Sequence, residues 1–164
     1  MDTFKRDLAS GKKIEEKYLA IIQKTYPDAY IIDGYCKEWD IYIPSKSIGI
    51  EVKSDNMSQQ TGNIIVEIRF NGKPSALSTT KSKYWIFDTG VGTMCVEINA
   101  LKKLASKSEL KTWISKGDTK PKDGYRIKQR YVEEISISVE EMLQSIETGS
   151  GKDVEGGLDM WCNV

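Results

Sequence analysis

The sequence predicts a domain of mixed α/β (α+β) class, in which a central mixed sheet of four to five strands is flanked by helices. Three observations predict this class. Residues 8–24 repeat apolar side chains with a helical period, residues 29–98 hold several short apolar runs, and helical patterns return after residue 98. The chain has 164 residues, of which 39% are hydrophobic and 29% charged, which is enough to bury one core without disulfides. We expect one folded domain over residues 1–147.

The first helix is expected over residues 8–24, before Pro27, which cannot continue it. In helical phase Glu15 falls within the apolar stripe, whereas Glu16 points away from it. A carboxylate on the buried side of a helix needs a reason. Glu15 is therefore a candidate site residue, and Glu16 is its fallback. The stripe consists of Leu8, Ile14, Tyr18, Leu19, Ile21 and Ile22.

Three short runs with strand character follow the helix, over residues 29–32, 39–44 and 47–53. Turn-forming residues separate the last two runs, which predicts a meander of antiparallel strands. Because successive side chains of a strand point to opposite faces, the apolar residues mark one face and the charged residues the other. The apolar face holds Trp39, Ile41, Ile43, Ile48, Ile50 and Val52, and the other face holds Asp40, Glu51 and Lys53.

The remaining elements are predicted with less regular patterns. Strands are expected over residues 63–70, 83–88 and 92–98, helices over 98–113 and 139–146, and a mixed extended segment over 125–137. The run 83–88 is apolar nearly throughout, as a central strand would be, and a turn at 89–91 would join it to the next strand. Residues 148–164 are rich in glycine and acidic residues, which predicts a flexible tail; the alternative is a partner-binding or dimer-swapping segment.

Composition excludes several kinds of chemistry. The chain has no histidine, which removes Ser-His and Cys-His catalysis and histidine-dependent zinc sites. Its three cysteines, Cys36, Cys95 and Cys162, are widely spaced and odd in number, so neither a disulfide framework nor a CxxC zinc site is expected. Acid–base or metal chemistry must therefore rest on carboxylates, lysine, tyrosine or water.

The net charge of zero conceals two segments of opposite sign. Residues 101–131 hold ten basic and three acidic residues, a net of +7, and residues 132–164 hold one basic and eight acidic residues, a net of −7. The positive segment either faces phosphates or is an ordinary solvated surface.

No apolar run approaches the ~20 residues that a membrane span requires. The first thirteen residues lack an apolar segment followed by a small-residue cleavage site. We therefore expect no membrane partner and a cytoplasmic location, which would be the host cytoplasm if the chain is phage-encoded.

The pattern of Asp40, Glu51 and Lys53 suits phosphodiester hydrolysis. That reaction needs charge neutralisation on the phosphoryl group and hydroxide near neutral pH, both of which Mg²⁺ held by carboxylates supplies. A lysine two residues after the second carboxylate lies on the same strand face, where its ammonium can polarise the attacking water or stabilise developing charge. The same string also occurs as plain charges on a solvated strand face.

These residues resemble the PD-(D/E)XK nuclease superfamily, and in particular its phage-encoded endonucleases. The resemblance rests on Asp40, ten intervening residues and Glu51-Val52-Lys53, preceded by a helix that bears Glu15. It implies a restriction-endonuclease-like core of αβββαβ order. It also implies Asp40, Glu51 and Glu15 as metal ligands, Lys53 as the catalytic lysine, and Mg²⁺ as the cofactor, with Mn²⁺ able to substitute.

The resemblance extends through residues 63–87, which suggests accessory positions at Glu67 and Lys81. Each has a plainer reading, Glu67 as a surface strand residue and Lys81 as a loop charge. The position before Asp40 is tryptophan where the family often has proline, a position that the family tolerates loosely.

The function expected is a Mg²⁺-dependent DNA endonuclease. One alternative is a Holliday-junction or branched-DNA resolvase of the same fold, which would act as a homodimer. The other is a catalytically inactive nucleic-acid-binding or assembly protein. DNA is the expected partner in each of the nuclease readings.

Overall fold

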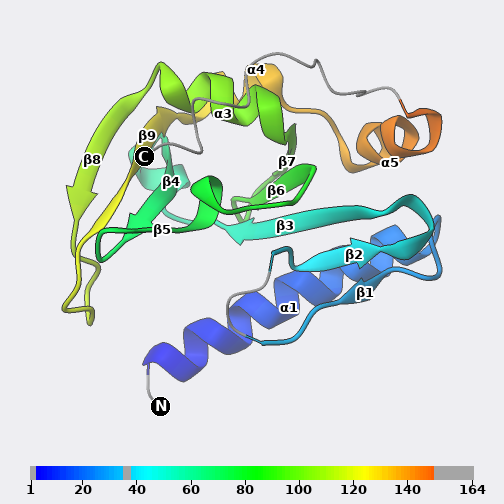
Figure 1. Ribbon diagram of the computed structural model, residues 1–164, viewed down its shortest axis with the longest axis horizontal. Coiled ribbons are helices and arrows are strands. Elements are labelled where there is room, and N and C mark those ends of the chain that lie inside the picture. Colours follow the sequence, from blue (N-terminus) through cyan, green and yellow to red (C-terminus); the bar gives the residue numbers. More distant parts are fainter. Residues whose placement is uncertain (1–2, 35–37, 150–164) are drawn as a thin grey trace.

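A computed structural model describes residues 3–34 and 38–149. The first helix, α1 (Thr3–Gln23), begins earlier than the apolar stripe predicts and ends, as expected, before Pro27. Tyr18 and Ile22 are fully buried, because the stripe packs on one face of a sheet. Glu15 is half-buried whereas Glu16 is exposed, as the helical phase predicts. Figure 1 shows α1 lying along the strands β1 and β2.

The sheet under α1 is mixed and has five strands in the order β1-β2-β3-β6-β7. The predicted meander and the predicted hairpin are both confirmed, because β1, β2 and β3 pair antiparallel and β6 pairs antiparallel with β7. The contact between β3 and β6 is parallel. The strands are β1 (Tyr30–Ile31), β2 (Ile41–Ile43), β3 (Ile48–Ser54), β6 (Tyr84–Asp88) and β7 (Thr93–Glu97).

A second sheet is antiparallel, has four strands in the order β5-β4-β9-β8, and lies beside the first (Figure 1). The sequence pattern predicted one sheet, and it predicted helix through residue 113. The helix prediction was wrong for residues 109–113, because they form a strand. They pair with β9, where Gly124 is essential: a Cβ there would lie 2.4 Å from the backbone oxygen of Val66. The strands are β4 (Asn63–Phe70), β5 (Lys73–Pro74), β8 (Glu109–Trp113) and β9 (Lys122–Lys128).

Short helices connect and cover the sheets. The expected helix after residue 98 is confirmed in its first half as α3, and the expected helix at 139–146 is α5. The segment expected to be extended over 125–137 is divided between β9 and α4. The helical elements after α1 are η1 (Pro44–Lys46), α2 (Ser58–Thr61), η2 (Ala76–Ser78), α3 (Ile98–Ser106), α4 (Gln129–Ile135) and α5 (Val139–Thr148).

The first sheet separates two hydrophobic cores. Ile50 and Val52 of β3 pack in the core under α1 and α5, whereas Trp85 and Phe87 of β6 pack in the core toward the second sheet. This division fixes the two faces of β3, because register pairs Glu51 with Trp85 and Lys53 with Phe87. Glu51 and Lys53 therefore share the face opposite α1.

Cys95 is buried in the first core, and burial raises the pKa of its thiol to about 12, so it is an inert packing residue. The other two cysteines and the tail at 150–164 lie outside the described residues.

Candidate active site

Asp40 lies immediately before β2 and is 4% exposed. Its Oδ2 accepts a hydrogen bond of 2.7 Å from the backbone N–H of Val52, the residue between Glu51 and Lys53. A hydrogen bond to a carboxylate is stronger than one between neutral groups. The carboxylate is therefore fixed against the peptide that joins Glu51 to Val52, at the strand that carries the other two predicted site residues.

A local irregularity of the sheet brings Asp40 to this position. The backbone N–H of Asp40 donates to the carbonyl of Ile50 over 3.0 Å, although register pairs Ile50 with Ile41. Two residues thus oppose one, as in a β-bulge, which re-aims the side chains beside it. Simple alternation was wrong for Trp39: its ring stacks on Tyr42, with centroids 4.7 Å apart, on the face opposite Ile41.

Glu51 and Lys53 form an ion pair on the face opposite α1. Lys53 Nζ lies 2.6 Å from Glu51 Oε1, and their side chains are 39% and 13% exposed. The ammonium also lies 5.3 Å from the centroid of the Trp85 ring. Burial of Glu51 keeps its carboxylate within the fold, while Lys53 retains an open side toward solvent.

Glu15 belongs to α1, which covers the other side of the sheet, where Ile50 and Val52 are buried. Within residues 3–34 and 38–149, no three His, Cys, Asp or Glu side chains are grouped closely enough to hold a metal ion. The structure therefore brings Asp40 to the strand of Glu51 without assembling these two and Glu15 into a set of three ligands. A ligand role for Glu15 stays a prediction.

The donor set still fits Mg²⁺, because that ion is commonly held by one or two carboxylates together with waters and substrate phosphates. Asp40, immediately before β2, and Glu51, on the adjacent strand β3, supply hard oxygen ligands. Both carboxylates already have hydrogen-bond or ionic partners, Val52 N–H and Lys53, which would orient them toward a cation.

The two predicted accessory residues have defined partners. Glu67 is half-buried on β4 and accepts a hydrogen bond of 2.5 Å from Ser75 Oγ. Lys81 forms an ion pair of 2.7 Å with Glu38, two residues before Asp40, and its side chain is 64% exposed. The segment between β5 and β6 therefore borders the residues that precede β2, and Lys81 contacts a residue two positions before Asp40.

A polar cluster at the carboxyl end of β6 was not predicted. Asp88, which is 6% exposed, accepts hydrogen bonds at Oδ2 from Tyr18 OH at 2.7 Å and from Lys17 Nζ at 2.9 Å. Its Oδ1 accepts from the backbone N–H of Gly90. Burial opposes ionisation, but these donors outweigh it and lower the pKa of the Asp88 carboxyl. The only sequence signal was a charge that ends an apolar strand.

Asp88 also joins the ends of the two parallel strands. Its carbonyl accepts the N–H of Asp55 over 2.8 Å, and Asp55 Oδ1 in turn accepts the N–H of Ser58 at the start of α2. Burial raises the pKa of the Asp55 carboxyl. The cluster fixes α1 and α2 to the end of β3, just beyond Lys53.

We expect Asp88→Asn to lower the free energy of unfolding by roughly 1.5–3 kcal/mol at pH 7. The carboxylate accepts hydrogen bonds at both oxygens, and the neutral amide keeps only one acceptor oxygen and loses the charge that strengthens these bonds. The folded pKa of Asp88 is depressed, so its stabilisation is complete above the unfolded value of about 3.9 and is lost as pH falls through the folded pKa. Urea denaturation should show that the free energies of unfolding of the wild type and Asp88→Asn become equal at acidic pH. The control Asp7→Asn, at an exposed helix position, should have the same free energy of unfolding as the wild type at pH 7 and at acidic pH. An unchanged stability of Asp88→Asn at pH 7 would contradict the account.

Comparison with known proteins gives no family for the chain: it matches no family model, no curated protein and no solved structure. Among the helices of residues 3–34 and 38–149, none combines the length and apolar character that crossing a membrane would need.

Proposed function

We propose that this protein is a metal-dependent nuclease that hydrolyses phosphodiester bonds in DNA. The observation that carries the proposal is the position of the Asp40 carboxylate, which is bound to the amide between Glu51 and Lys53 while the Lys53 ammonium contacts Glu51. Two carboxylates and one ammonium of this kind suit the binding of Mg²⁺ and the cleavage of a phosphodiester.

The order of elements supports a restriction-endonuclease-like core. A helix, an antiparallel three-stranded meander and a strand parallel to the third follow the αβββαβ order, with α1, β1, β2, β3 and β6 in those places. The crossover between β3 and β6 departs from a single helix, because it contains α2, β4 and β5. We take this crossover as an elaboration that contributes β4 and β5 to the second sheet.

The chemistry divides among the three residues. Asp40 and Glu51 would hold Mg²⁺, which when bound neutralises phosphate charge and lowers the pKa of a water ligand. Lys53 has a partly exposed ammonium, which can donate a hydrogen bond to a water or phosphate oxygen placed against Glu51. The Trp85 ring beneath this ammonium limits its positions.

The accessory residues have smaller roles in the proposal. Lys81 is exposed and close to Glu38, so its ammonium can exchange that carboxylate for a substrate phosphate at small cost. Glu67 would act through Ser75, whose hydroxyl it holds at the start of the segment that leads to Lys81.

The test is a cleavage assay of the full chain on linear duplex, single-stranded and four-way-junction DNA, with Mg²⁺ or Mn²⁺ and with EDTA as the matched control. We expect cleavage in the metal-containing reactions and none in EDTA. Preference for the junction, together with a homodimer in solution, would identify the resolvase alternative. Binding without cleavage of any of the three substrates would refute the nuclease proposal and favour a catalytically inactive binding protein.

A further inference from the structure

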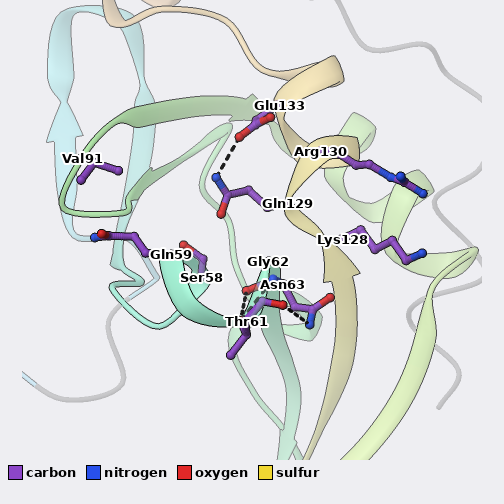
Figure 2. Close-up of a pocket in the computed structure, with 10 residues that line it drawn as sticks. All are labelled: Ser58, Gln59, Thr61, Gly62, Asn63, Val91, Lys128, Gln129, Arg130 and Glu133. Carbon is purple, nitrogen blue, oxygen red and sulfur yellow. Dashed lines mark hydrogen bonds between the residues drawn. The ribbon is translucent and has the colours of Figure 1, made fainter.

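Two adjoining pockets lie beyond the carboxyl end of β3. The first, of about 730 Å³, is bounded by α2, by the tip of the β6–β7 hairpin and by the start of α4. The second, of about 630 Å³, continues toward α3 and β8. Asn63 and Lys128 line both, so we treat the two as one feature and call it the α2–α4 groove. Figure 2 shows α2 and Val91 on one side of the first pocket and β9 and α4 on the other.

The charges of the groove are positive on the β9–α4 side. Lys128 and Arg130 are exposed, and Figure 2 shows both extending to the same side, away from Val91. Within the described ranges no carboxylate pairs with either of them or with Lys107 of the second pocket. The Arg130 guanidinium lies 4.9 Å from the Tyr131 ring centroid, which restricts its motion.

The two acidic residues of the groove are already neutralised or held. Arg126 forms an ion pair with Glu109 within the second pocket. Glu133 accepts a hydrogen bond of 2.8 Å from the side-chain amide of Gln129. Apart from Val91 and Gly62, the remaining side chains of the first pocket carry amides or hydroxyls, which can donate hydrogen bonds to phosphate oxygens. The second pocket adds Ser108, together with the more apolar surface of Leu104 and Tyr131.

One wall of the groove follows directly from the strand that carries the candidate active site. Ser58, in its wall, follows Lys53 by only five residues, and the Asp55–Asp88 contact fixes that wall to the ends of β3 and β6. A nucleic-acid strand that leaves the site at the end of β3 would next meet α2 and the side chains of Lys128 and Arg130.

We infer that the α2–α4 groove binds the phosphate backbone of the DNA that flanks the cleaved bond. The inference rests on the proposed function for its choice of DNA. The two adjoining pockets share Lys128, and the groove cations that have no carboxylate partner among the described residues account for part of the positive segment at residues 101–131. Other basic residues of that segment are paired locally, such as Lys111 with Glu109 and Lys122 with Asp118.

The test compares two double variants that remove the same charge from the same segment. Lys128→Ala/Arg130→Ala removes the groove pair. Lys116→Ala/Lys120→Ala is the control, because both lysines are exposed in the loop between β8 and β9 and line neither pocket. Affinity for a fluorescently labelled linear duplex is measured by anisotropy in EDTA, so that cleavage does not contribute.

We expect the groove variant to bind about 10-fold more weakly at low salt and the control within about 2-fold of the wild type. Between about 50 and 200 mM KCl, the slope of log affinity against log salt should fall by about 2 in magnitude for the groove variant, one for each phosphate contact. Equal losses for the two variants would overturn the inference, because the effect would then be one of net charge. If the wild type bound polyglutamate as tightly as DNA, the groove would recognise negative charge in general, and the inference that its ligand is DNA would be overturned.

Failure here is separable from failure of the proposed function. If the wild type cleaves DNA and the groove variant binds DNA as tightly as the wild type, the inference about the groove fails and the nuclease proposal stands. If the wild type cleaves none of the DNA substrates, and DNA binding is weakened in the groove variant but not in the control variant, the nuclease proposal fails and the groove remains a DNA contact.

Discussion

Lys53→Ala is expected to lower the rate of DNA cleavage by roughly 10²–10³-fold, the loss typical of removing one donor that stabilises charge in a transition state. The fold should tolerate the change, because the Lys53 side chain is 39% exposed and belongs to neither hydrophobic core. Cleavage is measured as single-turnover rates at saturating enzyme, and stability by urea denaturation.

Two further measurements separate a catalytic role from a structural one. The Mg²⁺ concentration for half-maximal rate should not rise in Lys53→Ala, since removing a cation beside Glu51 cannot weaken the attraction of that carboxylate for Mg²⁺. DNA affinity in EDTA should change by less than about 2-fold for one partly exposed charge. Lys13→Ala, on the exposed side of α1, is the matched control. A Lys53→Ala enzyme that cleaves within about 3-fold of the wild type would exclude Lys53 from the chemistry.

Asp40→Asn is expected to reduce cleavage by about 10²–10⁴-fold while leaving the protein folded, because the charge proposed to hold Mg²⁺ is removed and the shape is kept. The carboxamide oxygen can still accept the hydrogen bond that the Val52 amide donates to Oδ2. Unlike Lys53→Ala, this variant should need more Mg²⁺ for half-maximal rate, which a metal titration of the cleavage rate measures.

Asp40→Ala provides the contrast. It removes the acceptor and leaves the N–H of Val52, a buried residue, without its partner, at a cost of about 1–3 kcal/mol in the free energy of unfolding. Calorimetry should therefore rank the variants wild type, Asn and Ala in stability, with both variants inactive. Asp33→Asn removes an exposed carboxylate and should change neither property. Full activity in Asp40→Asn, or the same Mg²⁺ requirement as the wild type, would remove Asp40 from the metal site.

Local patterns predicted the elements on which the candidate site is built. The helical stripe of α1, the alternation of β3 and the apolar run of β6 each come from side chains that are neighbours in the chain, so their period is visible without knowing the fold. The same patterns selected Glu15 over Glu16 and placed Glu51 and Lys53 on one strand face. Mixed α/β class and the antiparallel meander followed from these elements.

Alternation failed where the backbone departs from regular geometry. The extra residue opposite Ile50 turned Trp39 to the face opposite the one predicted, and it directed Asp40 toward the Val52 amide. A β-bulge depends on how two strands pair and leaves no period in either strand alone. Asp40 was therefore identified by its spacing from Glu51, whereas its position relative to that strand came from the pairing.

The sequence by itself determined the helix α1, the meander and the central strand, because each shows as a pattern of side chains within a short segment. It also determined the choice of Asp40, Glu51 and Lys53 as the residues proposed for catalysis, through their spacing along the chain. Only the tertiary structure decided the second sheet, the Asp88 cluster and the α2–α4 groove. Asp88 meets Tyr18 across 70 positions, and Lys128 of the groove pairs in register with Asn63 of β4. Such contacts depend on chain topology, because topology decides which distant segments meet. It also decides which basic side chains at those segments have no carboxylate beside them.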